Sequence, residues 1–148
     1  MSNHVIPEGF VRCAFEVPVP FIDNLEVYYR EHADSVDIGA WVLDDYRNGG
    51  PMAHGGFLMT LGDIATGHAV TMRKGVNRFS VHVSFNMNFY TGVPVGSWIE
   101  VRAKVTKEGR ELVFSTCDYV VDGQVVGHAD AVMKSAEIRR GTQPVRDA

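Results

Sequence analysis

One stretch of the sequence decides the fold: Asn48-Gly49-Gly50-Pro51-Met52-Ala53-His54-Gly55-Gly56-Phe57-Leu58-Met59-Thr60-Leu61-Gly62-Asp63. Its first half is rich in glycine and proline and predicts a loop. From His54 onward apolar residues recur at helical spacing, so a helix should begin here, with free N–H groups that can bind an oxyanion. Asp63 lies two turns into this otherwise apolar helix, where a carboxylate is costly unless it is paired or functional. Donors and a carboxylate together favour acyl chemistry.

The pattern around this stretch predicts one long helix and several strands. The helix should run from about residue 54 to 74, with Gly75 as the residue that ends it. Apolar and polar residues then alternate from 79 to 90, which indicates a strand with one buried face. Further strands are expected over 98–106, 112–121 and 124–138, and a hairpin over 25–30 and 36–43. This order predicts an α+β fold in which a curled antiparallel sheet of five to six strands wraps around one central helix.

Length and composition limit the class of protein. The 148 residues suffice for one domain. We expect an arm over 1–24 that packs on a domain over 25–138, and a polar tail over 139–148. The net charge of -4 gives no general attraction to nucleic acid. No apolar stretch approaches the roughly 20 residues of a membrane span, and no secretory leader is visible, so a soluble cytoplasmic protein with no membrane association is expected.

The spacing of cysteine and histidine gives no sign of a metal site or another cofactor. Cys13 and Cys117 are far apart in the sequence and lack ligand spacing, as do the histidines. Both cysteines are expected to be reduced thiols without a chemical role.

The chain resembles the hotdog-fold acyl-CoA thioesterases of the phenylacetate pathway, the PaaI-like family. The resemblance rests on Asn48, on the His54-Gly55-Gly56 triplet and on Asp63, nine residues after His54. It extends over about residues 25–138. It implies a hotdog fold and an enzyme that hydrolyses the thioester of a small aryl or medium-chain acyl-CoA. It also implies a homodimer or a homotetramer built as a dimer of dimers.

Helix geometry indicates that such a site is shared between two chains. Gly55 and Asp63 are eight residues apart, which is about 12 Å along a helix. One reactive carbonyl cannot meet both. Two antiparallel helices across a two-fold axis would bring the start of one close to the middle of the other. The Gly55 N–H would then hold the oxyanion, while the partner's Asp63 attacks directly or activates a water, and the sequence leaves both routes open.

Other residues are assigned supporting roles. By resemblance, Asn48 would orient the water or the carboxylate. For His54, a capping or positioning role is favoured over that of a base. His82 stands where the family commonly has Ser or Thr, and it could replace that hydrogen bond, act as a second base, narrow the acyl pocket or simply lie on a polar strand face. Ser84 is expected on the same face. Substrate contacts are predicted at Gly56, Phe57, Ser84, Arg73 and Arg78, the arginines toward the phosphates of coenzyme A.

Two alternative functions remain at this point. A non-catalytic acyl-CoA sensor or binding module would keep the pocket without needing Asp63. A hotdog hydratase or dehydratase would need a histidine and a carboxylate at other spacings. The sequence leaves open the acyl group, and also whether the carrier is coenzyme A or a protein-bound pantetheine.

Overall fold

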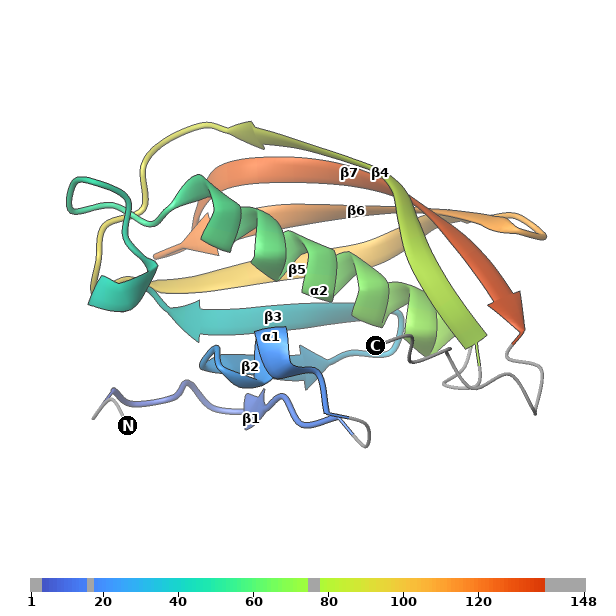
Figure 1. Cartoon of the computed structure of the whole chain (residues 1–148), viewed down its shortest axis with the longest axis horizontal. Helices are drawn as coiled ribbons and strands as arrows, with labels where there is room; N and C mark the ends of the chain where they lie inside the picture. The colour runs from blue at the N-terminus through green and yellow to red at the C-terminus, as the bar shows by residue number, and fades with distance from the viewer. Residues whose placement is uncertain (1–3, 16–17, 75–77, 138–148) are drawn as a thin grey trace, which may run out of the picture.

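In the computed structural model, which describes residues 4–15, 18–74 and 78–137, a seven-stranded antiparallel sheet curls around one long helix (Figure 1). In chain order the elements are β1 (Val11–Arg12), α1 (Pro20–Asp23), β2 (Val27–Glu31), β3 (Ser35–Trp41), the short 3-10 helix η1 (Asp44–Tyr46), α2 (Gly55–Lys74), β4 (Arg78–Phe89), β5 (Trp98–Glu108), β6 (Leu112–Val121) and β7 (Gln124–Glu137). The strand order is β1-β2-β3-β5-β6-β7-β4. The strand that follows the helix, β4, therefore forms one edge of the sheet.

The predicted helix and the predicted curled sheet are confirmed. The additional elements are β1 and α1, which lie within the segment expected to be an arm. β1 has only two residues, paired with Tyr28 and Tyr29 of β2, and so short a strand leaves no period in the sequence. The expected helix end at Gly75 and the tail over 139–148 lie outside the described residues.

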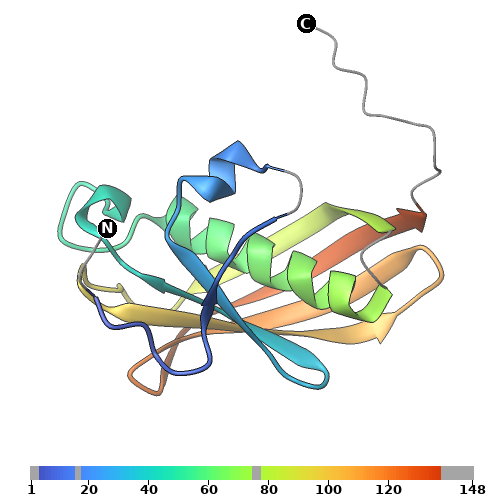
Figure 2. The same ribbon diagram turned by 90° about the horizontal axis from the view of Figure 1, so that it is seen from below.

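The core lies between the concave face of the sheet and α2, which runs across that face (Figure 2). Alternate residues of β5 are buried over its first half, as a period-2 strand with one face on the core requires. In β3 the five residues 36–40 are all buried, so both faces of this strand are covered. Gly62 brings the helix close to the sheet, because a Cβ atom there would overlap the Tyr119 hydroxyl and the Phe85 ring. The absence of a side chain at Gly62 thus sets the distance between the sheet and the turn of α2 that carries Asp63.

β4 departs from the prediction of a single apolar face. Its pairing with β7 shifts by one residue at a β-bulge: His82 lies opposite Met133, but Ser84 lies opposite Val132. Neighbouring residues of β7 point to opposite faces of the sheet. The expectation that Ser84 shares the face of His82 is therefore wrong, because the bulge inserts an extra residue between them.

The bulge also divides the apolar residues of β4. Beyond it, Phe85 points inward and packs against the core. Before and within it, Val81 and Val83 are exposed on the single chain. Among the residues that the structure describes, no strand pairs with the outer edge of β4, so this edge combines free backbone groups with apolar side chains.

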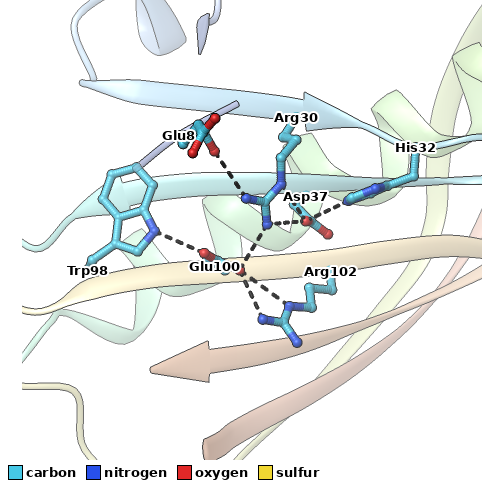
Figure 3. Close-up of polar contacts among 7 residues, drawn as sticks. All are labelled: Glu8, Arg30, His32, Asp37, Trp98, Glu100 and Arg102. Carbon is cyan, nitrogen blue, oxygen red and sulfur yellow. Dashed lines mark hydrogen bonds and ion pairs between the residues drawn. The ribbon is translucent and has the colours of Figure 1, made fainter. Parts of the chain in front are cut away.

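A polar network on the convex side of the sheet holds the N-terminal segment (Figure 3). The Arg30 guanidinium donates to Asp37 Oδ2 at 2.8 Å and to the Glu8 carbonyl at 3.3 Å. It also lies 4.3 Å from the centre of the Phe10 ring. His32 Nε2 lies 2.8 Å from the same oxygen of Asp37. Asp37 is buried, so these contacts compensate for its desolvation.

Among the described helices, none is both long and apolar enough to cross a membrane.

Candidate active site

The first turn of α2 is capped by the residue before it. His54 Nδ1 accepts a hydrogen bond from the Gly56 N–H at 2.9 Å, and the backbone N–H of His54 donates to the Tyr46 carbonyl at 2.7 Å. This is the side-chain bond that an N-cap residue makes. Within the described part of the chain, the Gly55 N–H has no hydrogen-bond partner. It is left as a donor at the positive end of the helix dipole.

The loop before the helix is closed on itself. The Asn48 N–H donates to the Met52 carbonyl at 2.7 Å, and Asn48 Oδ1 accepts from the Gly50 N–H, also at 2.7 Å. The Ala53 N–H donates to the Val93 carbonyl, which ties the loop to the segment after β4. The Asn48 side chain thus shapes the turn through its oxygen.

Asp63, His82 and Thr66 form a chain of polar contacts between α2 and β4. Asp63 Oδ1 lies 2.8 Å from His82 Nδ1, and His82 Nε2 lies 2.8 Å from Thr66 Oγ1. The Thr66 hydroxyl donates to the Gly62 carbonyl at 2.8 Å. The Thr66 hydroxyl thus lies at the same distance from His82 Nε2 and from the Gly62 carbonyl, and it holds the side of the imidazole that faces away from Asp63.

Thr66 is the member of this chain that sequence reasoning missed. It is fully buried, three residues after Asp63, so it lies on the next turn of the same side of the helix. That spacing was visible in the sequence, but a threonine within an apolar helix is also compatible with ordinary packing. The contact becomes visible only in the fold, where His82 of the bulged strand β4 lies against Thr66 of α2.

A groove of about 900 Å³ begins at Asp63 and His82. Its lining residues come from α2, from β4 and from the segment that contains α1 and β2. Figure 1 shows β4 and this segment on opposite sides of α2. Its lining is largely apolar and includes Ile22, Ile64 and Met72. Cys13 also lines it, but burial raises the pKa of this thiol to about 11. Cys13 is therefore protonated at neutral pH and is a poor nucleophile.

The predicted site residues fall into two groups within one chain. Asp63 and His82 are in contact, midway along α2. Asn48, His54 and Gly55 lie together at its N-terminal end. The distance along the helix prevents the two groups from acting on one carbonyl within a single chain.

The predicted substrate contacts are dispersed. Gly56 is at the helix N-terminus with its N–H bonded to His54. Phe57 is buried in the core, with its ring stacked 4.4 Å from that of Tyr46. Ser84 lies beyond the bulge and accepts a hydrogen bond from Asn86. The side chain of Arg78 lies outside the described residues.

Arg73 lies at the opposite end of α2 from Gly55. Its Nε is 3.5 Å from Glu108 Oε2, while Lys74 Nζ is 2.7 Å from Glu108 Oε1. The hydrogen bond from Lys74 lowers the pKa of Glu108, so this carboxylate is ionised and partly neutralises the basic helix end.

Comparison with known proteins agrees with this fold. Residues 50–127 match the family model described as Thioesterase superfamily. A curated relative named "Putative esterase PA0474", from Pseudomonas aeruginosa, is 30% identical over 129 residues, which is 86% of this chain and 95% of the relative.

Solved structures show the same architecture. A mutant of the phenylacetic acid degradation protein PaaI from Thermus thermophilus has a TM-score of 0.72 at 24% identity, covering 78% of this chain and 98% of that one. The PaaI protein of the phenylacetic acid degradation operon of E. coli has a TM-score of 0.72 at 17% identity, with 80% and 84% covered. The class is therefore that of hotdog-fold thioester hydrolases. The chain belongs to the Thioesterase superfamily.

Proposed function

We propose that the protein is a cytoplasmic enzyme that hydrolyses the thioester bond of an acyl-CoA, with a small aryl or medium-chain acyl group. One observation carries the proposal. The Asp63 carboxylate is held by His82 at a groove of about 900 Å³, yet 59% of its side chain is exposed. A carboxylate that is oriented but accessible can act on a bound acyl group.

The proposed site contains residues from two protomers. The Gly55 N–H of one protomer polarises the thioester carbonyl and stabilises the oxyanion, and Asp63 of the other acts on the same carbonyl. Support comes from the separation of the two groups along α2 and from the unpaired edge of β4 with its exposed valines. Antiparallel pairing of two β4 edges across a two-fold axis would place the helices antiparallel. We propose a homodimer, or a homotetramer of two such dimers.

Asp63 can act by either of two routes. As a nucleophile it forms a bond to the carbonyl carbon and the coenzyme A thiolate leaves, giving an anhydride that water then hydrolyses. As a general base it takes a proton from the attacking water, and the thiolate leaves from the tetrahedral intermediate. In both routes His82, held by Thr66, keeps the carboxylate oriented. The Gly50 N–H donates to Asn48 Oδ1, so the amide NH2 of Asn48 is the group that we assign to orienting the water.

Phosphate contacts at the helix end are part of the proposal. About half of the Arg73 side chain is exposed, and its contact with Glu108 is long at 3.5 Å. Its guanidinium therefore has N–H groups available for a phosphate of coenzyme A. Arg78 is proposed for the same role because it follows closely in the sequence.

The experiment is thiol release from a panel of acyl-CoAs, with short and long aliphatic chains and with phenylacetyl and benzoyl groups. Wild type and Asp63→Asn are compared, because asparagine keeps the shape of the side chain and removes the charge. We expect turnover by the wild type and a loss of about a thousandfold in kcat in the variant. Binding of acyl-CoA without turnover by the wild type would instead support a sensor.

A further inference from the structure

The groove contains a second polar pair, away from the reactive carboxylate. Glu31, the last residue of β2, and His68 of α2 both line it. His68 Nε2 lies 2.9 Å from Glu31 Oε1. The His68 ring lies against the Tyr29 ring, with 5.2 Å between their centres. The pair therefore joins the strand to the helix at the groove, and the imidazole orients the carboxylate.

The spacing of His68 and Asp63 along α2 indicates how long an acyl group must be to reach from Asp63 to this pair. His68 follows Asp63 by five residues, which corresponds to about 7.5 Å of helix rise. Between them the groove is lined by the apolar Ile64 and by Gly67. An acyl group whose carbonyl lies at Asp63 would thus cross an apolar surface before its far end meets Glu31.

The carboxylate of Glu31 has capacity for a ligand. One of its oxygens is engaged by His68, and half of the side chain is exposed. An ion pair this exposed contributes little to stability, so the fold does not depend on Glu31 being fully occupied. An ionised carboxylate has only acceptor sites, so what it recognises is a hydrogen-bond donor.

We propose that the groove binds the acyl group and that Glu31, oriented by His68, accepts a hydrogen bond from a hydroxyl at the far end of that group. The substrates would then be thioesters of hydroxyacyl groups, with the hydroxyl about six carbons from the thioester. This inference rests on the proposed thioesterase function. It assigns Glu31 as a residue that determines specificity and His68 as its positioning residue.

The test compares kcat/KM for hexanoyl-CoA and 6-hydroxyhexanoyl-CoA, which differ by one hydroxyl. We expect the wild type to prefer the hydroxylated substrate about tenfold, because its hydroxyl gains a charged acceptor. Glu31→Met keeps the length of the side chain without an acceptor and should abolish the preference. His68→Phe keeps a ring against Tyr29 and should weaken it. The ratio of two substrates on one protein does not change with the fraction that is folded.

Asp34→Asn is the matched control, since Asp34 is an exposed carboxylate in the turn between β2 and β3 and does not line the groove. It should leave the tenfold preference unchanged. Hydrolysis of both substrates without a preference, or a preference that persists in Glu31→Met, would overturn this inference and leave the thioesterase proposal standing. Turnover of other acyl-CoAs of the panel but of neither C6 substrate would overturn this inference alone. A protein that hydrolyses neither these two substrates nor any acyl-CoA of the panel would overturn both proposals.

Discussion

Two aspartates of this protein are each paired with a histidine at 2.8 Å, but their surroundings differ. Asp37, on β3, is only 6% exposed, and both Arg30 and His32 contact its Oδ2. Asp63, on α2, receives one histidine contact and is 59% exposed at the groove. The pair distance alone therefore does not identify a reactive carboxylate. The difference lies in how much of the carboxylate remains available to a ligand.

The largest expected effect separates the two aspartates by stability. Asp37→Asn removes the charge that compensates the partly buried Arg30 guanidinium, so we expect a loss of about 3 kcal/mol in the free energy of unfolding. This corresponds to a fall in Tm of roughly 10 °C. Thermal unfolding followed by circular dichroism measures it. kcat per folded molecule should be unchanged, whereas Asp63→Asn should show the reverse pattern. A stable but inactive Asp37→Asn would break the comparison.

A smaller loss of activity is expected at Thr66, which acts on Asp63 only through His82. Thr66→Val keeps the shape of the side chain but removes the oxygen that lies 2.8 Å from His82 Nε2. We expect kcat to fall about tenfold with KM unchanged, because the imidazole loses its fixed orientation while the groove is intact. Steady-state kinetics with one acyl-CoA measures both parameters.

The chain offers a matched control for Thr66. Thr116 Oγ1 lies 3.1 Å from His128 Nε2, and His128 Nδ1 lies 2.7 Å from Asp118 Oδ1. These residues repeat the Thr–His–Asp order on β6 and β7, and none of them lines the groove. Thr116→Val should therefore keep wild-type kcat. An equal loss in the two variants would show that the effect is not specific to the Asp63 site.

The smallest effect concerns this third pair and depends on pH. The hydrogen bond to Asp118 raises the pKa of His128, despite an opposing effect of burial. A raised folded-state pKa means that the pair stabilises the protein at pH values below the ordinary histidine pKa of about 6.5. That contribution is lost as pH rises through the raised folded value.

Asp118→Asn should accordingly lower the free energy of unfolding at pH 6 by less than about 1 kcal/mol, since Asp118 is half exposed. At pH 9 the variant and the wild type should be equally stable. Urea unfolding at the two pH values measures the difference. A deficit of the same size at both pH values would contradict the assignment to His128.

Regular elements could be predicted from the sequence because their signals are local. The helix over 54–74 matches α2 (Gly55–Lys74), and the alternation over 112–121 matches β6. β1 could not be predicted, because two residues form a strand only through their pairing with β2. The bulge of β4 was also invisible, since it depends on the register with β7. A period-2 pattern gives no sign that its buried face changes partway.

Those parts of the candidate site whose residues are neighbours in the sequence could be predicted. His54 and Gly56 lie close together in the sequence, and a capping or positioning role was favoured for His54 over that of a base. The approach of His82 to Asp63 required a fold, because β4 must cross α2 at one particular turn. Thr66 was missed for the same reason. The contact between Glu31 and His68 joins residues that are 37 positions apart in the sequence, so no local pattern could predict it.

The central claim is that Gly55 and Asp63 act from different protomers, and mixing two inactive variants tests it most directly. Gly55→Pro removes only the proposed N–H donor, at the first helical position, where proline is tolerated. Gly55→Ala, which keeps the N–H and makes only ordinary contact with Phe89, is the control. Refolding Gly55→Pro with Asp63→Asn at equal amounts should restore about a quarter of wild-type activity, since half of the dimers carry one intact site. No recovery in proteins shown to have exchanged subunits would contradict a shared site.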